Sequence, residues 1–133
     1  MSLNNSERET LVRIKTEKQP RHWLMPKKII EGEMWAAGAN RLYYAAYYAV
    51  SALLLNNGIS VRTHEGVIRM FSMHFVKTGI VSKEMGSLYT KLFSLRLTGD
   101  YDDDYSVTKE DVTTKVKGTK VLIQIIINLI NPQ

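Results

Sequence analysis

The sequence contains no cysteine among its 133 residues. This absence excludes a disulfide framework, a metal site built on thiolates and a thiol nucleophile. Disulfides are rare in the cytoplasm, so a chain without cysteine fits the cytoplasmic localisation that we predict. The histidines, His22, His64 and His74, share no metal-ligand spacing. We therefore predict no metal site, and no part of the sequence indicates a cofactor.

Long apolar runs are also absent. The most aliphatic run, "VLIQIIINLI" at 121–130, covers ten residues and includes a Gln, whereas a membrane-spanning helix needs about 20. The beginning of the chain, "MSLNNSERET", is polar and lacks the apolar region of a signal peptide. We expect no membrane association and a single domain over 1–133.

Charge is unevenly distributed. Eighteen Lys and Arg residues stand against thirteen Asp and Glu residues, which gives a net charge of +5. Such an excess favours a nucleic-acid or nucleotide partner. The acidic residues concentrate in 100–111, whereas 1–30 and 62–83 are basic.

The first expected helix begins with a capping box, in which Ser6 is the N-cap and Glu9 reaches back to it. Pro20 and Pro26 follow. An interior proline removes a helical hydrogen bond and clashes with the preceding turn, so a break or kink is expected over 19–27.

Four more helices are expected after this break. The first, about 26–56, carries Leu and Ala at helical spacing and ends at Gly58, which can adopt the left-handed conformation. The others cover about 63–77, 82–99, where the helix fades, and 109–130. Their predicted N-caps are Thr63, Ser82 and Thr108. The fold class predicted is all-α, a four- to five-helix up-and-down bundle.

Four tyrosines crowd into "NRLYYAAYYAV" at 40–50. Tyr43 and Tyr47 form one i,i+4 pair, and Tyr44 and Tyr48 form another. Arg41 lies three residues before Tyr44, so it shares a helix face with that pair. The rings can serve core packing, or they can line a polar seam at a subunit interface or a ligand groove. Both interpretations stay open at this point.

The segment "SLRLTGDYDDDYSVTKED" at 94–111 is the most acidic part of the chain. Four of its aspartates stand at positions 1, 3, 5 and 12 of a calcium-loop pattern. However, Tyr105 occupies position 6, where the loop needs Gly, and position 12 lacks the usual Glu. Asp100 is four residues from Arg96, so a helical ion pair is available. Most of these aspartates are predicted to solvate a loop and to begin the last helix.

Three blocks, "ANRLYYAAYYAVSALLL", "THEG" and "HFVKTGIVSKEMGSLYTKLFSLRLTGDYDD", closely resemble the HEPN domain family (higher eukaryotes and prokaryotes nucleotide-binding) over about 30–130. The resemblance is closest to its small, single-domain bacterial branch. It implies a helical bundle, often a homodimer, that acts in toxin–antitoxin or defence systems beside a minimal nucleotidyltransferase. Many members are metal-independent endoribonucleases, and others serve as binding partners.

The ribonuclease motif that this resemblance implies is an Arg and a His separated by four to six residues. Arg96 matches the Arg, but the His position falls on Tyr101, Asp102 or Asp103. Histidine moves protons near pH 7, whereas the ordinary pKa of tyrosine is about 10. Five helical positions turn through about 140°, so Arg96 and Tyr101 converge on one ligand only if the chain unwinds at Gly99.

Our leading hypothesis is a HEPN-fold module that binds a nucleotide, a nucleic acid or a partner protein. The alternatives are an endoribonuclease that uses Arg96 and Tyr101 as catalytic residues, and a structural dimerisation domain. His64 is expected near the surface, and it is the histidine to test as a substitute acid or base; His74 is expected to be half-buried. The predicted binding residues are Asn40, Arg41, Tyr44, Tyr48, His64 and Asp100.

Overall fold

The computed structural model describes residues 35–101 and 107–132. The predicted N-terminal helix, the break at 19–27 and His22 lie outside the described residues. Within them the secondary structure is helical, with no strand, which confirms the all-α prediction. None of the described helices is long and apolar enough to span a membrane.

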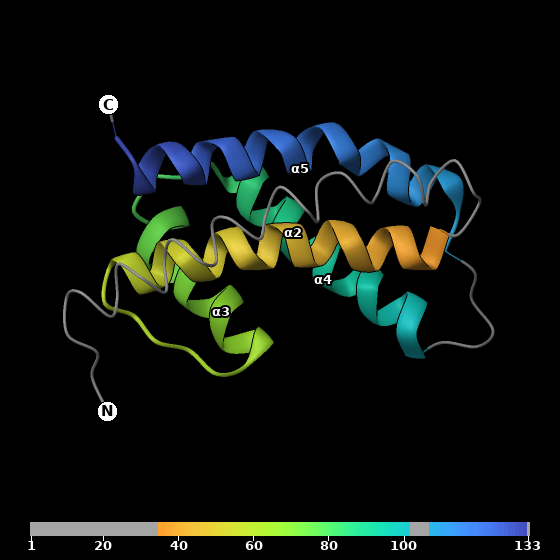
Figure 1. Cartoon of the computed structure of the whole chain (residues 1–133), viewed down its shortest axis with the longest axis horizontal. Coiled ribbons are helices and arrows are strands. Elements are labelled where there is room, and N and C mark those ends of the chain that lie inside the picture. Colours follow the sequence, from red (N-terminus) through yellow and green to blue (C-terminus); the bar gives the residue numbers. More distant parts are fainter. Residues whose placement is uncertain (1–34, 102–106, 133) are drawn as a thin grey trace.

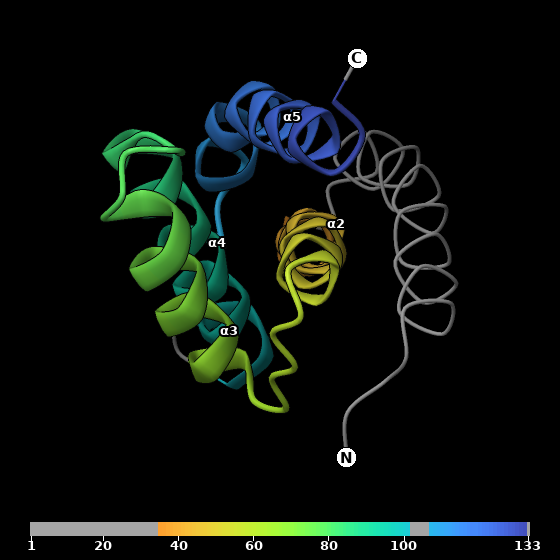
Figure 2. The same cartoon turned by 90° about the vertical axis from the view of Figure 1, so that its left-hand side faces the viewer.

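Helix α2 is the centre of the arrangement. Helix α5 packs along one side of it, and α3 and α4 cover another (Figures 1 and 2). Helices α2 and α5 run in the same direction, and α4 runs in the opposite direction (Figure 1). The bounds are α2 Trp35–Asn56, α3 His64–Phe71, a π-helix η1 at Ser72–Val76, α4 Lys83–Tyr101 and α5 Lys109–Ile130.

The composition of α2 explains its central place. Small side chains let neighbouring helices approach closely, and Ala39, Ala45 and Ala46 are fully buried. Two tyrosines, Tyr43 on α2 and Tyr89 on α4, are the largest fully buried side chains among the described residues. The core therefore combines close helix contact with aromatic packing.

The helix ends follow the sequence closely. The Thr63 hydroxyl accepts the Gly66 N–H at 2.9 Å, which caps α3. Thr108 and Asp111 form a reciprocal capping box at the start of α5. Gly58 has φ 78°, so the left-handed end of α2 is confirmed. Because these signals are local, each could be predicted from a few neighbouring residues.

The third helix departs from its predicted form. After Phe71 the backbone widens into η1, where the Lys77 N–H bonds to the Ser72 carbonyl at 2.8 Å. Phe71 and Phe75 are both buried, with ring centroids 6.1 Å apart, and His74 is exposed. The prediction of a half-buried His74 was wrong, because the wider turn points Phe75 inward instead.

Helix α4 does not unwind at Gly99 but continues to Tyr101. A Cβ atom at Gly99 would lie 3.3 Å from both the Ala36 Cβ and the Val107 Cγ2 atoms. This glycine therefore lets the end of α4 pack closely on the first turn of α2. The condition for Arg96 and Tyr101 to converge on one ligand is not met by the backbone of α4.

Candidate functional site

Helices α2, α3 and α4 together build a cluster of rings around one arginine. We call it the Arg96 site. Tyr43, at its base, is fully buried, and the other side chains are half-buried, so the site has both a packed floor and an accessible rim. Its members are Tyr43, Tyr44, Tyr47, His64, Phe93 and Arg96.

Tyr43 connects the three helices. Its hydroxyl shares a hydrogen bond of 2.5 Å with Nδ1 of His64. Its ring stacks on Tyr89 of α4, with centroids 6.0 Å apart and planes 15° from parallel. Burial is the main cause that raises the pKa of both tyrosines well above 10. Both phenols are therefore neutral at physiological pH.

The guanidinium of Arg96 lies over two tyrosine rings. Its Cζ is 5.6 Å from the ring centre of Tyr43 and 5.3 Å from that of Tyr44. Contacts of this length are cation–π interactions, which fix the orientation of the side chain. Arginine keeps its charge at all physiological pH values. The site therefore has a permanent positive charge on a half-buried residue, whose Nε atom is buried.

His64 stands at the beginning of α3, between the rings of α2 and α4. Its ring centre is 4.8 Å from that of Tyr47 and 6.1 Å from that of Phe93, whose plane is tilted by 21°. Burial lowers the pKa of His64 below its ordinary 6.5; the Arg96 charge lowers it further, whereas Glu65 opposes both effects. The imidazole is therefore neutral at pH 7.

His64 is half-buried, which agrees with the predicted position near the surface, and its ring lies against the ring of Tyr47. Thr63, its neighbour, caps α3 and places His64 at the first position of that helix. The Tyr43 hydroxyl occupies Nδ1, and Nε2 makes no hydrogen bond to any residue in the described part of the chain. One ring nitrogen is thus held by the protein, and the other is available to a ligand.

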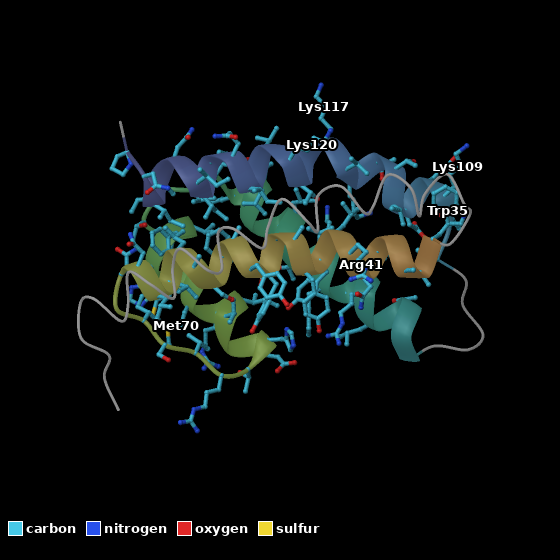
Figure 3. The ribbon with its side chains drawn as sticks, viewed as in Figure 1. Trp35, Arg41, Met70, Lys109, Lys117 and Lys120 are labelled. Carbon is cyan, nitrogen blue, oxygen red and sulfur yellow. The ribbon has the colours of Figure 1, made fainter. Side chains whose placement is uncertain are left out.

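The remaining predicted residues divide into three groups. Tyr48 lies beside the site, with its ring centre 5.9 Å from that of Tyr47. Asn40 and Arg41 are half-buried about one turn before Tyr44 on α2, and Figure 3 shows the place of Arg41. The side chains of Asp100 and Tyr101 lie outside the described residues, so their assigned roles stay predictions.

Sequence reasoning missed Tyr43, Tyr47 and Phe93 as members of the site. The i,i+4 spacing of Tyr43 and Tyr47 was a signal for a shared face, but it did not show which face would meet α4. For Phe93 the available signal was its position three residues before Arg96. This spacing places the two side chains on neighbouring parts of the same helix face.

No three His, Asp or Glu side chains of residues 35–99 and 107–132 lie together where they could hold a metal ion. The arrangement can instead attract an anion to Arg96, offer a hydrogen bond from His64 and present tyrosine rings to an aromatic ligand. These are the elements that recognise a nucleotide, whose phosphate is anionic and whose base has an aromatic face.

Known proteins are similar in sequence to this chain over most of its length. A 39% identical "UPF0332 protein" of Thermotoga maritima matches over 104 residues, which are 78% of this chain and 79% of that protein. The "Putative toxin MJ0605" of Methanocaldococcus jannaschii is 33% identical over 84 residues, which are 63% of each chain.

A solved structure also resembles this fold. TT1696 from Thermus thermophilus superposes with a TM-score of 0.75, covering 89% of this chain and 97% of that one at 12% identity. The sequence model of the HEPN domain family matches residues 27–129. This range includes all four described α-helices except the last residue of α5. The chain therefore belongs to the HEPN domain family.

Proposed function

We propose that this chain is a toxin-type HEPN module that binds RNA or a nucleotide at the Arg96 site. The toxin setting is supported by the relatives that carry the name of a toxin. The binding role is supported by the chemistry of the site, where a fixed cation lies beside half-exposed aromatic rings.

One observation carries the proposal, namely the position of the Arg96 guanidinium over the rings of Tyr43 and Tyr44. The rings already hold the guanidinium in one orientation. It therefore loses less conformational entropy when it donates two hydrogen bonds to a phosphate. Tyr44 and Tyr47 are half-buried, so part of each ring stays accessible for stacking on a base. The excess positive charge of the chain adds a general attraction to nucleic acid.

The test is a titration of fluorescent single-stranded oligouridylate at low salt, with the wild type and Arg96→Ala. We expect Arg96→Ala to weaken binding by about tenfold or more, since charge-assisted hydrogen bonds to phosphate are about 1.5–3 kcal/mol each. The matched control is Lys117→Ala. Lys117 is exposed and projects from α5 away from α2 (Figure 3), so its loss should change affinity little.

Equal losses in the two variants would contradict the proposal, because they would show binding by charge alone. The same RNA also serves to examine cleavage. We expect the RNA to stay intact, because the family's His position is filled by Tyr101 or an aspartate. Cleavage that Arg96→Ala abolishes and Tyr101→Phe reduces would instead establish the endoribonuclease alternative.

A further inference from the structure

His64 and Arg96 come from different helices and converge on the same two tyrosines. The ring of His64 lies 5.6 Å from that of Tyr43 and 6.0 Å from that of Tyr44. The Arg96 Cζ atom lies 5.6 Å and 5.3 Å from the same two ring centres. The Arg96 charge also lowers the pKa of His64, so the two groups are near enough for their charges to interact, and one ligand group can lie near both.

We propose that the phosphate of a bound RNA or nucleotide sits between the Arg96 guanidinium and Nε2 of His64, and that His64 takes up a proton when it binds. This inference rests on the proposed function and assigns a second residue and a proton to it. Arg96 supplies a permanent charge, whereas His64 supplies a charge only when the ligand is present.

The groups around His64 explain why it is neutral without a ligand and takes up a proton when the ligand binds. Helix α4 contributes the Arg96 cation, and α3 contributes the Glu65 carboxylate, which is exposed. Helix α2 contributes the phenols of Tyr43, Tyr44 and Tyr47, of which Tyr43 holds Nδ1. Burial and Arg96 both keep the pKa of free His64 low. A phosphate offsets the Arg96 charge and favours the imidazolium, so binding raises that pKa.

Two features of the site prepare His64 for this role. The hydrogen bond to Tyr43 fixes the ring and directs the second nitrogen away from the core phenol. The cap at Thr63 fixes the backbone from which the ring projects. An imidazolium also donates from both nitrogens, so the bond to Tyr43 can persist, with the phenol oxygen as acceptor, after the proton arrives.

The experiment measures oligouridylate affinity between about pH 5.5 and pH 8, the range in which histidine titrates. Oligouridylate is chosen because neither its phosphodiesters nor its uracil bases titrate there. We expect the wild type to bind more tightly as the pH falls, by up to about tenfold per pH unit, which is the limit for one coupled proton. Proton uptake is measured directly by calorimetry in buffers with different ionisation enthalpies.

The decisive variant is His64→Asn. The Asn amide can reproduce the polar contact of Nδ1 with the Tyr43 hydroxyl, but it cannot titrate. Binding by this variant should keep its dependence on Arg96 and lose its dependence on pH. The matched control is His74→Asn, since His74 is exposed in η1; it should behave as the wild type does. Circular dichroism at each pH verifies that all three chains are folded.

The outcomes separate this inference from the function beneath it. If binding requires Arg96 but is independent of pH, or if His64→Asn keeps the pH dependence, the RNA-binding role stands and the proton-coupled site is wrong. If the wild type binds no oligouridylate at any pH in this range, the RNA-binding role and the proton-coupled RNA site are both wrong. A rise in the His64 pKa on RNA addition, followed by its imidazole NMR signals, supports the inference.

Discussion

Tyr43 links the fold to the candidate site. Its ring is fully buried and stacks on Tyr89, whereas its hydroxyl reaches His64 at the half-exposed rim. A phenylalanine would fill the same space but would leave Nδ1 of His64 without its partner. The hydroxyl therefore serves the site more than the core, which explains why a tyrosine stands at so buried a position.

The free energy of unfolding should depend on the protonation of His64. The pKa of His64 is below 6.5 in the folded chain and near 6.5 in the unfolded chain. As the pH falls, the unfolded state therefore binds the His64 proton at a higher pH than the folded state does. The contribution of His64 to the free energy of unfolding is thus lost progressively below about pH 7. Chemical denaturation of the wild type and His64→Asn at several pH values measures this contribution.

We expect the stability advantage of the wild type over His64→Asn to shrink as the pH is lowered through 6.5, the ordinary pKa of histidine. The variant keeps every other titrating group, including Glu65 and His74, so their contributions cancel in the comparison. An advantage that stays constant or grows at low pH would show that the pKa of His64 is not lowered by folding.

Arg96 was identifiable from the sequence because it matches the Arg of the ribonuclease motif in the HEPN domain family. Its neighbourhood was not, because His64 is 32 positions away and lies on a different helix. Spacing along one helix predicts which side chains share a face, but the meeting of α3 with α4 is decided by packing across the bundle. His64 was therefore named as a candidate without its connection to Arg96.

At the scale of the elements, the start of α3 controls the site. Thr63 accepts the Gly66 N–H, and a Cβ at Gly66 would lie 2.5 Å from the Val61 Cγ1 atom and 2.7 Å from the Thr63 Oγ1 atom. The turn thus needs both a capping hydroxyl and a residue without a side chain. His64 is between these two positions, so its placement depends on this turn.

Thr63→Ala should reduce the free energy of unfolding by about 1 kcal/mol, the typical loss when an N-cap hydroxyl is removed. It should also weaken RNA binding, because the first turn of α3 would hold His64 less firmly. Thr63→Ser keeps the hydroxyl and should restore both properties. Urea denaturation and the oligouridylate titration measure the two effects; a Thr63→Ala chain as stable as the wild type would contradict the assigned cap.

Helix ends and helix interiors differed in how well they could be predicted. Thr63, Gly58 and Thr108 carry signals that act within a few residues, and all three were placed correctly. The continuation of α4 through Gly99 responds to a neighbour that is distant in the sequence. Gly99, for example, contacts Ala36 of α2, and no local rule distinguishes such a contact from a helix end.

At the scale of the whole molecule, α2 separates two surfaces of different character. The Arg96 site lies where α2 meets α3 and α4, and α5 packs on another side of α2 (Figure 2). The outer face of α5 carries exposed lysines, of which Lys109 and Lys117 project away from α2 (Figure 3). Under the proposed function, a net charge of +5 would attract RNA to both surfaces, so affinity alone would not locate the binding site.

The salt dependence of binding distinguishes the two surfaces. For single-stranded nucleic acid, each phosphate contact contributes about 0.7 to the slope of log affinity against log salt concentration. Arg96→Gln should reduce the magnitude of that slope by about this amount, because it removes one contact that releases a counterion. Lys117→Gln removes the same formal charge from α5 and should leave the slope of the wild type unchanged.

The two substitutions change the net charge equally, so any long-range effect of charge appears in both and cancels. Only a direct phosphate contact produces a difference between their slopes. If Lys117→Gln lowers the slope and Arg96→Gln does not, the RNA lies on α5, and the tyrosines around Arg96 belong to packing. If only Arg96→Gln lowers it, the RNA contacts the Arg96 guanidinium, which lies over the rings of Tyr43 and Tyr44.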